Sequence, residues 1–274
     1  MKRTYHLWIL ALLITLGSAV YQRLTGPTYP KHYVTLLDSK AISVTLDRAH
    51  GGETDHPVTV ETNNPNINGR VEWKRYNTND QVATIPMVYT NGILTAQLPH
   101  QPPAGKLQYT VYLTDGKQTF SASTVIRFRG EVPAAVLILH IAFMFTGMLL
   151  SARTGLEMFT KEPLYKKLTY LTFVVITIGG MFLGPLVLNY AFNEWRTGFP
   201  FGNDITDNKT LIAFLAWFTA AVAVWKSPNP KRYILAAAVI TLLVFLIPHS
   251  LWGTELNYAA VRHPVQRDST MKTN

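Results

Sequence analysis

The stretch that decides the fold is PAAVLILHIAFMFTGMLLSA, residues 133–152, in which His140 is the one ionisable side chain. Roughly 20 consecutive apolar residues are enough to cross the hydrocarbon core of a bilayer as a helix. A second stretch of this kind, YILAAAVITLLVFLIPHSLW at 233–252, contains His249. An ionisable side chain at membrane depth is costly, so both histidines are candidates for a functional role.

Three further stretches are apolar enough to be spans, at 7–21, 168–192 and 210–225. Together the five stretches predict an integral membrane protein, whose last four spans, within 132–258, form an all-α four-helix transmembrane bundle. The first span, within 1–24, fits either a retained N-terminal membrane anchor or a signal peptide. We favour the retained anchor.

The positive charge of the chain is grouped at the ends of these spans. The formal net charge is +9, and short loops rich in lysine and arginine mark the cytoplasmic side of a membrane. The clusters are Lys2 and Arg3; Arg153, Lys161, Lys166 and Lys167; and Lys226, Lys231 and Arg232. We therefore expect a multi-pass protein of the bacterial cytoplasmic (inner) membrane, with its N-terminus inside the cell and its C-terminus outside. The basic balance does not indicate nucleic-acid binding, because no basic face recurs between the first two spans.

Residues 28–129, between the first two spans, alternate polar and apolar side chains at period two. Runs such as Leu107–Leu113 are separated by turn residues such as Asn91-Gly92. Short strands at this spacing predict an all-β antiparallel sandwich, here placed outside the cytoplasm, in the periplasm. The chain has no cysteine, so this domain depends on its apolar core and not on disulfides or thiolate-bound metal. Residues 259–274 are predicted to be a polar C-terminal tail.

A proline-rich turn precedes one of these strands in the stretch LPHQPPAGKLQYTV at 98–111. This stretch resembles the corresponding side of fibronectin-type or immunoglobulin-like sandwiches, where such a turn leads into a strand with alternating aromatic residues. The resemblance covers this domain alone. It implies a fold and, by analogy, a role in binding or spacing, but no chemistry.

The β-rich region also contains histidines. His50 and His56 flank a Gly-Gly-Glu-Thr-Asp turn, so these two residues, with Glu53 and Asp55, offer a set of metal ligands. Turns are rich in such polar residues without any metal, so we expect a solvated loop here and not a metal site.

The two intramembrane histidines are expected at similar depth. His140 lies seven residues after Pro133, about 10 Å below the outer surface at ~1.5 Å per residue. His249 lies sixteen residues after Tyr233, about 24 Å along its helix and near the same face of a ~30 Å core. Facing imidazoles on two helices can hold haem b as axial ligands, or bind copper or zinc. The alternatives are a structural pair and a proton- or ligand-binding role, and we favour the structural pair.

The segment 193–210, NEWRTGFPFGNDITDNKT, is expected on the outer side and mixes aromatic, acidic and basic residues. The simplest interpretation makes Asp207 the N-cap of the fourth span and places the aromatic residues in the membrane interface. The carboxylates also offer ligands for a cation, and the basic side chains for an anion. These candidates are Glu194, Asp204 and Asp207, with Arg196 and Lys209. Glu255 follows His249 by six residues, and a turn at Gly253 would make it a hydrogen-bond partner of that imidazole.

No nucleophile triad, phosphate-binding loop or dinucleotide motif occurs in the sequence, so no hydrolase, kinase or dehydrogenase activity is indicated. We expect a non-enzymatic accessory or assembly subunit of a cytoplasmic-membrane complex. Its sandwich would dock an extracytoplasmic protein, and its helices would contact lipids and other membrane subunits. The alternative is a small b-type cytochrome, in which His140 and His249 hold haem b and carry electrons within a membrane redox complex.

Overall fold

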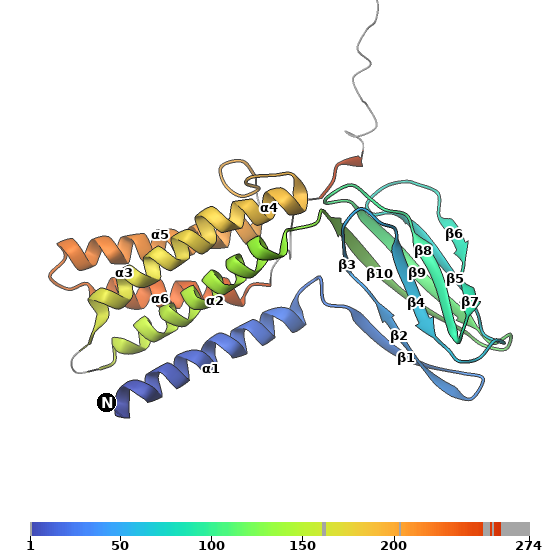
Figure 1. Ribbon diagram of the computed structural model, residues 1–274, viewed down its shortest axis with the longest axis horizontal. Helices are drawn as coiled ribbons and strands as arrows, with labels where there is room; N and C mark the ends of the chain where they lie inside the picture. Colours follow the sequence, from blue (N-terminus) through green and yellow to red (C-terminus); the bar gives the residue numbers. More distant parts are fainter. Residues whose placement is uncertain (1, 161–162, 203, 249–252, 254, 259–274) are drawn as a thin grey trace, which may run out of the picture. The chain divides into compact units, whose positions relative to one another are not determined.

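The computed structural model describes residues 2–160, 163–202, 204–248, 253 and 255–258. The chain forms two compact units, each described below by itself (Figure 1). A helical unit comprises Met1–Tyr29 and Gly130–Thr254, and a strand unit comprises Pro30–Arg129 with the segment that begins at Glu255.

Helices make up the first unit. Within the described residues they are α1 (Lys2–Thr25), α2 (Ala134–Glu157), α3 (Tyr165–Ile176), the π-helical turn η1 (Thr177–Leu183), α4 (Gly184–Phe192), α5 (Ile205–Lys226) and α6 (Lys231–Leu246). Because α3, η1 and α4 follow one another without a break, they act as one long helix.

Four helical segments of the described chain are long and apolar enough to cross a membrane: Tyr5–Thr25, Ala134–Glu157, Tyr165–Phe192 and Ile205–Lys226. They confirm four of the five predicted spans and are compatible with a multi-pass membrane protein. The fifth predicted span overlaps α6, whose 16 residues extend about 24 Å, short of a ~30 Å hydrocarbon core. The end of that prediction, 249–252, lies outside the described residues.

Small residues let the helices pack closely around α2. A Cβ atom added to Gly147 would lie 2.9 Å from Cγ1 of Ile176, and one on Gly155 would lie 2.7 Å from Cβ of Ala238. Glycine therefore allows α3 and α6 to approach α2, as small faces do in membrane bundles. Trp217 on α5 is fully buried, and its Nε1 donates to Oγ1 of Thr241 on α6 at 2.8 Å.

The strand unit contains two sheets and a separate hairpin (Figure 1). The hairpin joins β1 (Lys31–Leu37) to β2 (Lys40–Leu46). One sheet has the order β3-β10-β9-β5-β6, with β3 parallel to β10, and the other has the order β4-β8-β7. The strands are β3 (Ala49–Gly51), β4 (His56–Glu61), β5 (Asn68–Arg75), β6 (Ala83–Pro86), β7 (Val88–Thr90), β8 (Ile93–Leu98), β9 (Lys106–Thr114) and β10 (Thr119–Arg129).

The predicted alternation produces the core of this unit. Along β9, Leu107, Tyr109, Val111 and Leu113 are buried while the residues between them are more exposed, because successive side chains on a strand point to opposite faces. They join one apolar core with residues of both sheets and of β2. The predicted Asn91-Gly92 turn connects β7 to β8, and both residues have positive φ, as a two-residue hairpin turn requires.

The segment after the helices returns to the strand unit. The backbone N–H of Leu256 donates to the carbonyl of Ala104 at 3.2 Å, and the hydroxyl of Tyr258 accepts from the N–H of Lys106 at 2.9 Å. Glu255 forms an ion pair with the Lys106 ammonium. The sequence predicts that 132–258 belong to the helical bundle, but contacts place Glu255–Tyr258 with the strands, where the Tyr258 hydroxyl bonds the backbone of Lys106 at the start of β9.

Candidate functional site

His140 lies in the second turn of α2 and reaches η1. Its Nδ1 atom is 3.0 Å from the carbonyl oxygen of Gly179. Because a carbonyl can only accept, Nδ1 carries the proton, and in the neutral ring Nε2 keeps its lone pair. A histidine that binds a metal usually donates its other ring N–H in this way, since the bond fixes the tautomer and the ring orientation. This contact fixes the tautomer of His140 and leaves the lone pair on Nε2.

The π-helical turn is where three helices meet closely. The carbonyl of Gly179 also accepts the N–H of Gly184, so it serves two donors. A Cβ atom on Gly179 would lie 2.9 Å from Cβ of Phe143 on α2, and one on Gly180 would lie 2.5 Å from Cγ2 of Thr210 on α5. Glycine is needed at both positions for this approach. Short π-helical insertions are frequent at functional sites.

The second predicted cofactor ligand, His249, lies outside the described residues, so the pairing of the two histidines stays a prediction. The described chain immediately before it is held in place by a buried cation. Nζ of Lys209, a residue 4% exposed, donates to the carbonyl of Ile247 at 2.7 Å. Lys209 was a candidate for binding an anion, and here at least one of its donors joins the start of α5 to the end of α6.

The two aspartates of the 193–210 segment support its backbone. α5 begins at Ile205, and Oδ1 of Asp204 accepts from the N–H of Thr206 at 2.7 Å, so Asp204 is the N-cap. The prediction that Asp207 caps this helix is wrong, because the helix begins before that residue. Oδ2 of Asp207 instead accepts the backbone N–H groups of Thr197 at 2.6 Å and Gly198 at 3.1 Å. The carboxylates thus stabilise the loop and helix end.

The remaining candidates, Glu194, Arg196 and Glu255, have separate surroundings. Glu194 is exposed, and Nε of Arg196 donates to the carbonyl of Phe199 at 3.0 Å. Glu255, predicted to approach His249, is paired with Lys106 in the strand unit. Within the residues that the structure describes, no three histidine, aspartate or glutamate side chains are grouped to hold a metal ion.

The helical unit contains a buried ion pair that the sequence pattern does not predict. The apolar run places Arg153 in the loop after the second span. Arg153 and Glu157 both belong to the last turns of α2, and their side chains are 3% and 5% exposed. The guanidinium also lies over the ring of Trp8, 5.4 Å from its centroid, and Oε1 of Glu157 accepts the N–H of Leu164 at 2.9 Å. The i,i+4 spacing of opposite charges was the available signal.

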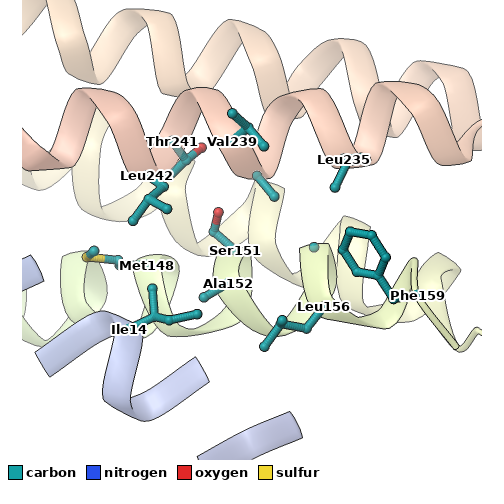
Figure 2. Close-up of a pocket in the computed structure, with 12 residues that line it drawn as sticks. Ile14, Met148, Ser151, Ala152, Leu156, Phe159, Leu235, Val239, Thr241 and Leu242 are labelled. Carbon is teal, nitrogen blue, oxygen red and sulfur yellow. The ribbon is translucent and has the colours of Figure 1, made fainter. Parts of the chain in front are cut away.

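An apolar cavity of about 240 Å³ lies between α1, α2 and α6. Figure 2 shows the side chains around it, with Ile14 on α1, Leu156 near the end of α2, Phe159 just after that helix, and Val239 and Leu242 on α6. These walls suit hydrocarbon better than a polar substrate.

Two histidines of the strand unit are in contact, one from an edge strand of each sheet. His50 is on β3 and His56 on β4, and their Nδ1 atoms are 3.3 Å apart. His56 is 4% exposed, so the expectation of a solvated loop is wrong for this residue, which is buried at the start of β4 with its ring against that of His50. Burial lowers the pKa of His56, the neighbouring His50 lowers it further, and Asp47 opposes both effects. Glu53 and Asp55 of the same turn are exposed.

Comparison with protein-family models gave no match, and comparison with curated proteins gave none either. The function proposed below therefore rests on the chemistry and geometry of the described residues.

Proposed function

We propose that the protein is a non-enzymatic accessory or assembly subunit of a complex in the bacterial cytoplasmic membrane. Its strand unit docks an extracytoplasmic partner protein along β1, and its helices anchor it among lipids and other membrane subunits. The observation that carries this proposal is the outer face of β1, where Val34 is 74% exposed and Leu36 is 66% exposed. Two large apolar side chains in water on one strand are typical of an interaction site.

The backbone of β1 is suited to the same role. Among the described strands, β1 pairs with β2 alone, so its other edge presents N–H and C=O groups that no described strand satisfies. Such an edge accepts an added strand from a partner, with main-chain hydrogen bonds giving affinity. Residues two apart on a strand face the same way, so Val34 and Leu36 would contact alternate side chains of the added strand. The basic side chains of Lys31 and Lys40 at the hairpin favour an extended segment with acidic flanks.

The strand order supports assigning this unit to the immunoglobulin-like class, which is often used for binding. In that class, the second, fourth and fifth strands share one sheet and the third, sixth and seventh share the other. The sheets β4-β8-β7 and β5-β9-β10 follow the same division when β4 is taken as the second strand. The positive charge of the short loops supports an orientation with this unit outside the cytoplasm.

Purification of the tagged chain from its native membrane in a mild detergent tests the proposal. We expect one stoichiometric partner with the wild-type chain and its loss from the double variant Val34→Glu/Leu36→Glu. Val88→Glu is the matched control, because Val88 is a 64% exposed valine on β7, the edge strand of the three-stranded sheet. A wild-type chain that purifies alone, or a double variant that keeps the partner, contradicts docking at β1.

A second candidate function is electron transfer as a small b-type cytochrome, and the orientation of His140 favours it. With Nδ1–H held by the carbonyl of Gly179, Nε2 is available as an axial ligand, and His249 is the proposed second ligand. The π-helical turn beside His140 is a further feature common at functional sites.

An absorption spectrum of the purified protein, oxidised and then reduced, tests this second function. The cytochrome proposal expects a haem b spectrum that disappears in His140→Ala and in His249→Ala. His32→Ala, which changes an exposed histidine of β1, should leave the spectrum unchanged. A colourless wild-type protein would exclude the cytochrome and leave the accessory-subunit proposal standing.

A further inference from the structure

The arrangement of His50 and His56 matches two ligands of one tetrahedral metal ion. Their Nδ1 atoms are 3.3 Å apart, and their ring centroids are 5.0 Å apart. With zinc–nitrogen bonds of ~2.0–2.1 Å and tetrahedral angles, two ligand nitrogens lie about 3.3 Å apart and their ring centroids about 5 Å apart. Neighbouring ligands of a square-planar ion at the same bond length would lie about 2.9 Å apart. The spacing therefore suits Zn²⁺ better than a square-planar ion.

The outer ring nitrogen of His50 has a hydrogen-bond partner of the kind that metal-binding histidines have, and that of His56 lies near a carboxylate. Nε2 of His50 lies 2.9 Å from the carbonyl oxygen of Thr54, to which it donates. Nε2 of His56 faces Oδ2 of Asp47 at 3.9 Å. The carbonyl holds the proton of His50 on Nε2 and leaves its Nδ1 as the ligand atom. The 3.9 Å contact of His56 is longer than a hydrogen bond, so it acts on that ring through charge alone. Without a metal, the two Nδ1 atoms share a hydrogen bond in which the Nδ1–H of His56 donates to the Nδ1 lone pair of His50. A metal ion bound by both Nδ1 atoms would replace that proton.

We propose that His50 and His56 bind one Zn²⁺ ion through their Nδ1 atoms, with water molecules as its remaining ligands. The described residues contain no group of three metal-binding side chains, so His50 and His56 are the two ligands that this part of the chain supplies. This inference is independent of docking at β1 and of the cytochrome candidate, because it concerns other residues.

Charges of both signs and an aromatic ring surround the pair. A Cβ atom built on Gly51 would lie 3.5 Å from Nε of Arg129, so a guanidinium lies beside this turn. Asp47, Glu53 and Asp55 bring three exposed carboxylates to the same connection between β2 and β4. The ring of Phe128, which is fully buried, packs edge-on to His50 at 5.5 Å and limits the movement of that imidazole.

Binding would connect the two sheets of the strand unit. His50 is on β3, the edge strand of the five-stranded sheet, and His56 is on β4, the edge strand of the three-stranded sheet. An ion held by both would bind the folded state and not the unfolded chain, so it should raise the unfolding temperature of this unit.

Zinc binding by the full-length, detergent-purified chain tests the proposal after removal of metals with a chelator. Equilibrium dialysis against Zn²⁺ followed by elemental analysis should give one Zn²⁺ more per wild-type chain than per His50→Ala or His56→Gln chain. His32→Ala is the matched control, because it removes an imidazole of the same unit that lies away from the pair, on β1. Metal-free circular dichroism of each variant checks that it is folded.

Two further measurements separate a metal site from a packing pair. Zn²⁺ should raise the unfolding temperature of the wild-type chain and of His32→Ala but not of His50→Ala. Asp47→Asn should weaken zinc affinity about 10–100-fold, as the loss of a partner of a metal-bound histidine usually does. Equal zinc content and an equal thermal response in the wild-type and His50→Ala chains would overturn the proposal. His50 is half-buried and not part of the apolar core, so this variant should remain folded.

Discussion

The ion pair within α2 should be among the most sensitive positions of the helical unit. The side chains of Arg153 and Glu157 are 3% and 5% exposed, so neither charge is hydrated when its partner is removed. Breaking a buried pair by neutralising one partner typically costs about 3–5 kcal/mol. We expect a loss of this size from Glu157→Gln. Glutamine keeps an oxygen for the N–H of Leu164, 2.9 Å from Oε1 in the wild-type chain, so the effect comes from the lost charge.

The free energy of unfolding in one fixed detergent, followed by tryptophan fluorescence, measures this loss. The double variant Arg153→Met/Glu157→Gln is the matched control, because it leaves no buried charge without a partner and should recover most of the stability. A single variant within ~1 kcal/mol of wild type, the range of exposed ion pairs, would refute the reasoning. So would a double variant no more stable than the single one.

Three other changes have defined outcomes. Backbone N–H groups lower the pKa of Asp115 to about 2, so the stability it contributes is present above its unfolded pKa of ~3.9 and is lost as pH falls through about 2. In calorimetry, the unfolding temperature of Asp115→Asn should therefore be lower than that of the wild type at pH 6. Near pH 2 the two unfolding temperatures should converge. Thr241→Val removes the acceptor of the buried Trp217 N–H and should cost about 1–3 kcal/mol in denaturant unfolding. The proposed orientation puts Lys117 of the strand unit outside the cytoplasm and Asn229, in the loop before α6, inside it. Since the chain has no cysteine of its own, an impermeant maleimide should label Lys117→Cys on intact cells but Asn229→Cys only after the membrane is opened.

The elements that the sequence predicted are those that depend on local patterns. Long apolar runs predicted four helices of membrane-spanning length, because the bilayer requires length and apolarity from each helix alone. Alternation predicted the strands, and Asn91-Gly92 predicted a turn between two of them. The structure forms this turn as a two-residue hairpin connection in which both residues have positive φ.

The candidate site was less predictable, because it depends on contacts between distant segments. The turn around His56 looks solvated in the sequence, yet the edges of two sheets bury this residue. Glu255 appeared to belong with the preceding helix, and its partner is Lys106 on β9. Arg153 looked like a loop cation because α2 continues past the end of the apolar run. His56 and Glu255 contact residues of other segments, which a local pattern does not reveal. For Arg153, the apolar run does not mark where α2 ends.

Docking along β1 is tested most directly by a photo-reactive amino acid in place of Leu36, with the same substitution at Val88 as control. Both side chains are exposed, at 66% and 64%, and each is on an edge strand. Irradiation of native membranes should give one major adduct from position 36, to an extracytoplasmic protein or domain, and none to that protein from position 88. No adduct at position 36, or the same adducts from both positions, would contradict the docking of a partner strand on β1.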